Sequence, residues 1–209
     1  MKRILSLILA VCLCLSVAVM ITSCGDGEFD GVTAEKWKDF LSEQRFDNVT
    51  INFTLSSDVN GEYAESSDIV KIADAKVYRK AVWVMSDDSN ELEAVFTGDE
   101  AVEQKKIFLG IFLSLLAERD NYVYDEDEGV YKAPNKITVV LDDIREGYHT
   151  EEAITNAKVK FDSKGNIEYF SGYFVETVKY GGEVVGVTQG DTVWTFSNFG
   201  TTVITEGAE

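Results

Sequence analysis

Stretches in which apolar and polar residues alternate, separated by short turn sequences, constrain the fold of this chain more than any other feature. The alternation is clearest over residues 49–55, where every second side chain is apolar. A period of two is typical of a strand with one buried face. Turn sequences at Asn60-Gly61 and at 162–166 join neighbouring stretches as hairpins. The pattern predicts a mainly antiparallel sheet.

Further strands are predicted along most of the chain. Their ranges are 68–73, 75–80, 81–85, 91–96, 122–124, 130–132, 136–141, 157–161, 167–178, 184–187 and 192–199. The acidic residues 125–129 are expected to form a solvated turn, because they lack the ligand pattern of a calcium-binding loop. Residues 147–152, which include His149, are expected to form a surface loop.

Two helices are predicted among these strands. The first covers residues 34–44, with Thr33 as its N-cap. The second covers about 99–119, with Thr97 and Glu100 as a capping box. Its centre, 107–117, is apolar on almost every side and too short to span a membrane. A helix of this kind has to be covered on every side, either inside the fold or by something else apolar.

The first residues of the chain have the composition of a secretion signal. Lys2 and Arg3 precede an apolar run, and Ile21-Thr22-Ser23-Cys24 follows it. An aliphatic residue, two small residues and a cysteine form a lipobox, which an ordinary transmembrane anchor does not require. We therefore expect a signal peptide at 1–23, a diacylated Cys24 with a flexible tether to residue 32, a single domain at 33–204, and a tail at 205–209. The expected location is the extracytoplasmic side of the cell membrane, with the lipid on Cys24 as the anchor.

Charge and cysteine content exclude several classes of function. Acidic residues outnumber basic ones by 37 to 19, so the chain lacks the basic surface that nucleic acid binding requires. Cys12 and Cys14 lie in the apolar run, which leaves the domain without a thiol beyond Cys24. Disulfides, nucleophilic cysteine chemistry and cysteine metal sites are therefore excluded from the domain.

Nothing in the sequence singles out a catalytic centre. His149 is the only histidine, and there is no nucleophile-elbow, phosphate-loop or dinucleotide-binding motif. We expect no enzyme activity, no cofactor and no metal, although a carboxylate pair that acts as an acid and a base stays open. Trp37, Trp83 and Trp194 could line a ligand site, but core packing is the favoured interpretation for each of them.

The order of elements and four segments carry a resemblance to a known family. The segments are 46–53, 121–132, 159–167 and 194–202. With a lipobox tether, an amphipathic helix, meandering strands and an apolar helix, the chain resembles the LolA/LppX-like bacterial lipoproteins. The resemblance implies an α+β fold, in which a curved antiparallel sheet forms an open half-barrel with helices packed on its concave face. It also implies a lipid or lipidated protein as ligand.

Two functions stay open from the sequence. In the first, the domain binds or carries a lipid or another apolar ligand in the half-barrel, in a pocket of about 300 Å³ or more. The candidate lining residues come from the first strand and the apolar helix: Val49, Ile51, Phe53, Leu55, Phe108, Ile111, Phe112 and Leu115. In the second, the domain is an interaction scaffold without a small-molecule ligand, and its acidic face or the segment 147–152 contacts a protein partner.

Overall fold

The computed structural model describes residues 32–59, 61–85, 88–142 and 148–205. The predicted signal peptide, the lipobox and Cys24 lie outside these residues, as do Asn60 and most of the predicted tail. Contacts divide the chain into one unit that ends at Val32 and a second that starts at Thr33. Every helix and strand named below belongs to the second unit, so a chain that starts after Cys24 keeps all of them.

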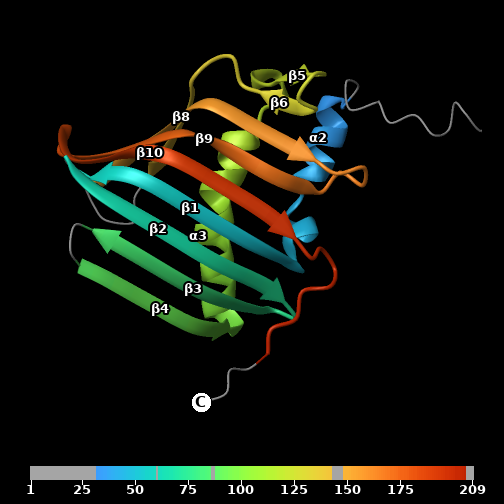
Figure 1. Cartoon of the computed structure of the whole chain (residues 1–209), viewed down its shortest axis with the longest axis horizontal. Helices are drawn as coiled ribbons and strands as arrows, with labels where there is room; N and C mark the ends of the chain where they lie inside the picture. The colour runs from blue at the N-terminus through green and yellow to red at the C-terminus, as the bar shows by residue number, and fades with distance from the viewer. Residues whose placement is uncertain (1–31, 60, 86–87, 143–147, 206–209) are drawn as a thin grey trace, which may run out of the picture. The chain divides into compact units, whose positions relative to one another are not determined.

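Within the described residues, ten strands form one antiparallel sheet. They are β1 (Val49–Val59), β2 (Glu62–Ala73), β3 (Lys76–Met85), β4 (Asp88–Thr97), β5 (Val123–Asp125), β6 (Val130–Lys132), β7 (Ile137–Asp142), β8 (Tyr148–Phe161), β9 (Ile167–Tyr180) and β10 (Glu183–Ser197). Their spatial order is β4-β3-β2-β1-β10-β9-β8-β6-β5, and β7 also pairs with β8. The first and last long strands, β1 and β10, are therefore neighbours. The sheet curves without closing (Figure 1), which confirms the predicted α+β half-barrel.

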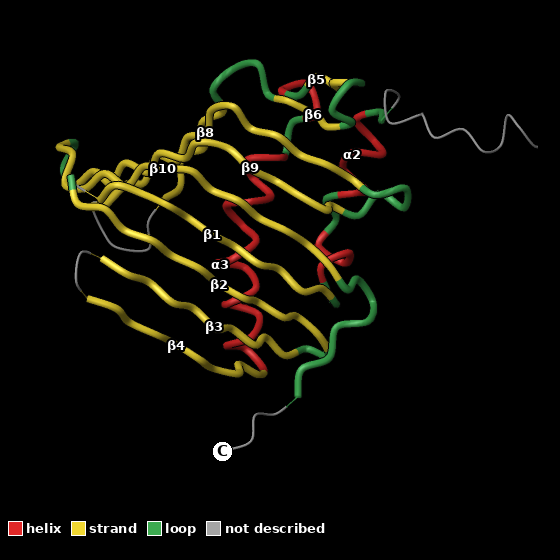
Figure 2. Tube along the Cα trace, viewed as in Figure 1, coloured by secondary structure: helices red, strands yellow, loops and turns green. Residues whose placement is uncertain are grey.

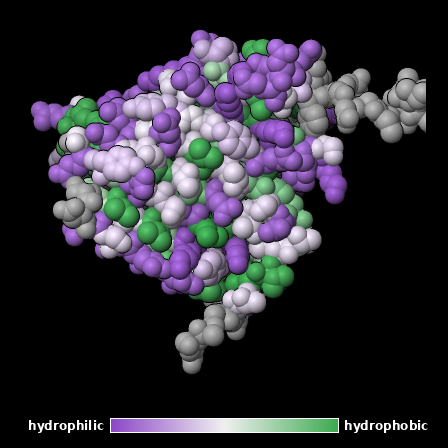
Figure 3. Space-filling model, viewed as in Figure 1, coloured by the Kyte–Doolittle hydropathy of each residue, from purple (hydrophilic) through white to green (hydrophobic). Residues whose placement is uncertain are grey.

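The longest helix of the described residues lies on the concave face of the sheet. It is α3 (Gly98–Leu116), and it crosses behind the strands in the view of Figure 2. The opposite face carries hydrophilic residues with hydrophobic ones scattered between them (Figure 3). No helix of the described segments is long and apolar enough to cross a membrane. One face of the sheet therefore packs against α3, and the other is hydrated.

The remaining helical segments in the described parts of the chain are short. They are α2 (Ala34–Phe40) and two 3₁₀ turns, η1 (Glu43–Phe46) and η2 (Arg119–Asn121). Thr33 caps α2 as predicted, because its hydroxyl accepts a hydrogen bond of 3.2 Å from the amide of Lys36. The predicted extension of this helix to residue 44 is wrong, since the backbone tightens into η1 after Leu41. The predicted capping box is also wrong, since the Thr97 side chain makes no capping bond.

Three predicted breaks in the sheet are absent. The strand β3 runs through residues 80 and 81, and the turn before it falls at Asp74 and Ala75, whose φ angles of 52° and 57° suit a two-residue hairpin turn. Residues 188–191 continue β10, because a side chain at Gly190 would strike the Ser56 carbonyl and a glycine lets the strands meet. Finally, the predicted surface loop at 147–152 is wrong from Tyr148 on, where β8 begins.

The core between α3 and the sheet is aromatic. Phe112 is fully buried at the centre of this core. Its ring centroid lies 5.3 Å from that of Phe170, 5.2 Å from that of Trp194 and 4.9 Å from that of Phe196. These partners come from β9 and β10, so the contacts hold α3 against the strands in the middle of the sheet.

A second aromatic cluster holds the end of α3. Trp37 is fully buried and its ring lies 5.3 Å from Tyr122, 5.2 Å from Tyr131 and 5.1 Å from Phe161. Its indole nitrogen donates a hydrogen bond of 2.7 Å to the Leu116 carbonyl. The Tyr122 hydroxyl donates a hydrogen bond of 3.0 Å to the carbonyl of Leu115, the residue before Leu116. Side chains thus satisfy two carbonyls that a helix end leaves without partners, and the predicted core role of Trp37 is confirmed.

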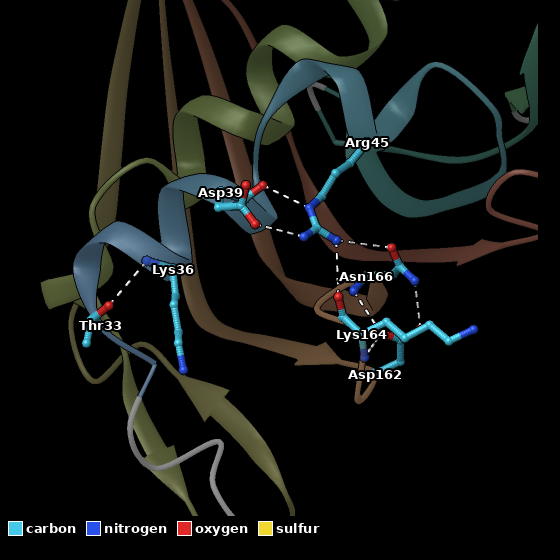
Figure 4. A network of polar contacts seen from close by, with 7 residues as sticks. All are labelled: Thr33, Lys36, Asp39, Arg45, Asp162, Lys164 and Asn166. Carbon is cyan, nitrogen blue, oxygen red and sulfur yellow. Dashed lines mark hydrogen bonds and ion pairs between the residues drawn. The ribbon is translucent and has the colours of Figure 1, made fainter.

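The turn between β8 and β9 is tied to α2 and η1. The Arg45 guanidinium donates to the Asp39 carboxylate at 2.8 Å and to the Lys164 carbonyl at 3.1 Å (Figure 4). Asp162 closes the turn by accepting from the amides of Lys164 and Asn166. The predicted hairpin turn at 162–166 is therefore confirmed, and Arg45 connects it to the first helical segments.

Replacing Trp37 by phenylalanine tests the cluster. We expect Trp37→Phe to lower the free energy of unfolding by about 1–3 kcal/mol, because the buried Leu116 carbonyl loses its donor. Urea unfolding followed by circular dichroism measures this change. Trp83→Phe is the matched control, since Trp83 is 40% exposed and a surface change alters stability by about 0.5 kcal/mol or less. Equal stability of the two variants would contradict the expectation.

Candidate ligand-binding site

A hollow of about 220 Å³ lies on the concave face, between α3 and the strands. We call it the concave cavity. Residues of α3 and of six strands line it: Phe53, Asp68, Arg79, Ile107, Phe108, Ile111, Phe112, Leu115, Glu152, Phe170, Phe174, Glu176, Thr192 and Trp194. Nine of these fourteen side chains are apolar, so the cavity has the mixed lining of a small-molecule site, with a few polar groups on an apolar surface.

Aromatic rings tilted against one another form one wall of the concave cavity. The ring of Trp194 lies 4.6 Å from Phe53 and 5.0 Å from Phe108. Its indole nitrogen donates to the Thr192 hydroxyl at 3.1 Å, so its polar edge is satisfied within the protein. The residue packs in the core and also lines the cavity, which extends the core role predicted for it. The core prediction for Trp83 is wrong, since that side chain is 40% exposed.

The helix α3 turns an apolar face toward the cavity. Its lining side chains recur at the spacing of one helical face, namely Ile107, Phe108, Ile111, Phe112 and Leu115. Phe112 and Leu115 are buried, whereas Ile107 is 55% exposed. The fold therefore does not cover this helix on every side, because the sheet stays open and leaves part of the helix accessible; of the two expected alternatives, coverage by something else apolar stays open.

The structure brings together five of the eight predicted lining residues. Phe53, Phe108, Ile111, Phe112 and Leu115 all line the concave cavity.

The other three predicted residues do not line it. Val49 and Ile51 are completely buried in the part of β1 that pairs with Ile72, Val70 and Phe196. Leu55 is partly exposed, beyond the cavity. The alternation of β1 thus identified the correct face of the strand, but not how far along it the core extends.

The expected pocket volume of 300 Å³ or more is wrong. The aromatic rings of Phe53, Phe108 and Trp194 occupy much of the space between helix and sheet. The remaining volume is about 220 Å³. The cavity as it stands therefore suits a small molecule or the end of a chain, and it does not hold a whole lipid.

An ion pair borders the cavity on the β2 and β3 side. The guanidinium of Arg79 donates to both carboxylate oxygens of Asp68, at 2.8 and 3.1 Å. Asp68 is 5% exposed, and this two-bond geometry is the strong form of such a pair. Arg79 also lies 6.0 Å above the ring of Phe108. The two charges neutralise each other, so this side of the cavity is polar but carries no net charge.

On the β8 and β9 side the cavity has two carboxylates. Glu152 of β8 lies directly opposite Glu176 of β9 in the sheet register. Glu152 is only 1% exposed, and its Oε2 atom has no hydrogen-bond partner among the described residues. Burial, together with repulsion from Glu176, raises the pKa of Glu152 to about 7. The carboxyl group is therefore poised to gain or lose a proton near neutral pH.

Sequence reasoning missed the polar lining residues. Glu152 fell in the predicted loop at 147–152, since the polar start of β8 hides its alternation. Asp68 was placed in a strand but not in a site, and only its pairing with Arg79 across the β2–β3 hairpin shows its role. An acidic residue among apolar neighbours inside a strand is the one sequence feature that could have indicated Asp68.

Other hollows are larger but differ in character. Two have volumes of about 620 and 670 Å³, and charged side chains such as Asp125, Lys132, Asp99 and Lys105 are prominent in their linings. No cluster of side chains that could hold a metal ion occurs in the described parts of the chain. The concave cavity is thus the better candidate for an apolar ligand.

Comparison with known proteins adds no family. No family model matches the sequence, and no curated protein matches it. One similar solved structure is the S-type phycobiliprotein lyase CPES from Guillardia theta, with 8% identity over 82% of this chain and 98% of the other, and a TM-score of 0.35. Another is a protein titled AttH from Nitrosomonas europaea, with 10% identity over 83% and 56% of the two chains and a TM-score of 0.31. Neither likeness bears on a ligand, so the function has to be inferred from the cavity.

The burial of Glu152 predicts a pH-dependent stability. Its pKa is about 7 in the fold and 4.5 as an ordinary glutamate, so the folded state binds the proton more tightly. Ionisation of the buried Glu152 carboxyl group therefore destabilises the folded state. This destabilisation is absent below about pH 4.5, grows between the two pKa values and is complete above about pH 7. We expect Glu152→Gln to gain up to about 3 kcal/mol over the wild type at about pH 8, and to lose that advantage at about pH 4.5.

Urea unfolding of the wild type and of Glu152→Gln between about pH 4.5 and about pH 8 measures the difference in their free energies of unfolding. Glu151→Gln is the control, because Glu151 is partly exposed and lies 3.3 Å from Lys179 on the other face of the strand. A pH-independent difference between Glu152→Gln and the wild type would show that the buried carboxyl group is not the cause.

Proposed function

We propose that this domain binds a small apolar molecule, or the apolar end of a larger one, in the concave cavity. The observation that carries the proposal is the open apolar face of α3, where Ile107, Phe108 and Ile111 stay accessible opposite the aromatic wall at Trp194. Exposing such a surface to water costs about 25 cal/mol for each Å². A ligand that covers it regains this free energy.

The proposal is narrower than the lipid carrier implied by the resemblance. Membership of the LolA/LppX-like family stays a prediction, and so does the absence of enzyme activity. The half-barrel supports the family prediction at the level of the fold alone. The scaffold alternative stays open as an outcome of the binding experiments, in which no apolar molecule would enter the cavity.

We further propose that Cys24 anchors the protein by its lipid on the extracytoplasmic side of the cell membrane. The lipobox at residues 21–24 supports this, because the cysteine follows two small residues at the end of an apolar run. Two acyl chains are needed for stable anchoring, which matches a diacylated cysteine. A strongly acidic domain gains nothing from anionic lipid headgroups, so the anchor has to be covalent.

Quenching of Trp194 fluorescence tests the cavity. We expect bromo-octanol to quench the intrinsic fluorescence of the chain from residue 25 on, because its bromine atom would contact the indole in the cavity wall. The quenching should be lost in Trp194→Phe. Ile111→Phe should weaken binding roughly tenfold or more, since overpacking costs about 1–3 kcal/mol.

A matched helix variant separates blocking from general damage. Val102→Phe adds the same ring to α3 at a site that is 68% exposed and does not line the concave cavity, so its binding should equal that of the wild type. Equal binding by all variants, or no quenching of the wild type, would contradict a ligand in this cavity. Recovery of a protein partner instead would favour the scaffold.

The anchor has its own test in a bacterial host. We expect the full chain to fractionate with membranes and to carry a diacylglycerol mass on Cys24 after removal of residues 1–23. Cys24→Ser should abolish both the lipid and the membrane association. Intact-protein mass spectrometry of the membrane fraction checks these outcomes, and an unmodified Cys24 would contradict the proposal.

A further inference from the structure

Glu152 makes the concave cavity more than an apolar hollow. Its side chain is 1% exposed, and Oε2 accepts no hydrogen bond from the described residues. A buried polar atom left unpaired is destabilising, because it has lost its hydrogen bonds to water. Buried groups without partners are rare in native proteins, so each one calls for a reason. The position of Glu152 in the cavity wall offers such a reason, since a ligand in the cavity can supply the hydrogen-bond donor that Oε2 lacks.

The charged groups that surround Glu152 determine whether a cationic, neutral or anionic ligand group is favoured as its hydrogen-bond donor. Glu176 of β9 lies directly opposite it and adds a second carboxylate to the lining. Val139 of β7 is its partner on the other side, and α3 contributes apolar side chains. Across β1 and β10 stands the pair of Asp68 and Arg79. Among the described lining residues, Arg79 is the single cation, and it is bound to Asp68.

This arrangement is selective for one class of ligand. An anionic head, such as a fatty-acid carboxylate, would meet repulsion from Glu152 and Glu176 in a medium where water screens poorly. A cation would meet the unpaired Glu152 carboxylate and the faces of aromatic rings, which attract positive charge as well as apolar groups. The ring of Phe108 already carries such a contact with Arg79.

Resting on the proposed function, we infer that the ligand is an organic cation, namely a protonated amine on an apolar body. Its ammonium group donates hydrogen bonds to the Glu152 carboxylate, and its apolar body lies against Phe108, Ile111 and Trp194. The cavity of about 220 Å³ limits that body to a small size. Arg79 does not contribute to recognition of the head, because Asp68 neutralises it.

The inference makes binding depend on pH in a defined direction. Burial and the nearby Glu176 raise the pKa of Glu152 to about 7, so the carboxylate form that attracts a cation predominates only above this value. An alkylamine keeps its proton throughout the neutral range, like the side chain of lysine. Its affinity should therefore rise about tenfold between about pH 6 and about pH 8, while the affinity of a neutral alcohol stays nearly constant.

Three ligands with the same chain test the inference. Octylamine, octanol and octanoate are titrated calorimetrically into the chain from residue 25 on, at each pH. We expect octylamine to bind best at the higher pH, and Glu152→Gln to remove both its preference and its pH dependence. Glu151→Gln should behave as the wild type, because its side chain reaches Lys179 instead. Circular dichroism confirms that each variant is folded.

The outcomes separate this inference from the proposed function. If octanol or octanoate binds as well as octylamine, or if Glu152→Gln leaves octylamine binding unchanged, the inference of a cationic ligand is wrong. The proposed binding of an apolar ligand in the concave cavity then still holds. If bromo-octanol quenches the fluorescence of Trp194 but octylamine does not bind, the inference of a cationic ligand is again wrong and the proposed function still holds. If none of these molecules binds, both the cation and the proposed function are overturned.

Discussion

The rest of the structure depends on the packing of the Phe112 ring of α3 against β9 and β10. An antiparallel sheet that does not close leaves a concave apolar face, and that face needs a cover. The fully buried ring of Phe112 contacts Phe170, Trp194 and Phe196 and so supplies the centre of that cover. Trp37 then holds the end of α3 through the Leu116 carbonyl. Because α3 is the one long helix in the described residues and the sheet is wide, the covering is incomplete, and the concave cavity is what remains.

The period of the apolar residues predicted most of this fold. The alternation over residues 49–55 identified β1 and its buried face, and the apolar run at 107–117 identified α3. The prediction failed where local composition and tertiary packing disagree. Gly190 looks like a strand breaker in the sequence, yet it allows β10 to approach β1. The polar start of β8 looks like a loop, yet its pairing with β7 and β9 makes it a strand.

The candidate site was predictable only in its apolar part. Five lining residues follow from periodicity, because a strand face and a helix face that are both apolar will meet. Val49 and Ile51 show the limit of this reasoning, since periodicity does not say where packing ends and a cavity begins. Glu152 was out of reach for a different reason, because its environment is created by Glu176, which follows it by one hairpin and becomes its neighbour only through the register.

The pairing of β1 with β10 has a consequence for how the chain reaches its native state. The sheet joins its first and last long strands at the centre, so its contact order is high, which slows folding. The chain cannot complete this ladder until residues 183–197 are available to pair with β1. Because β10 lies in the middle of the strand order, loss of this strand would split the sheet and not merely trim its edge.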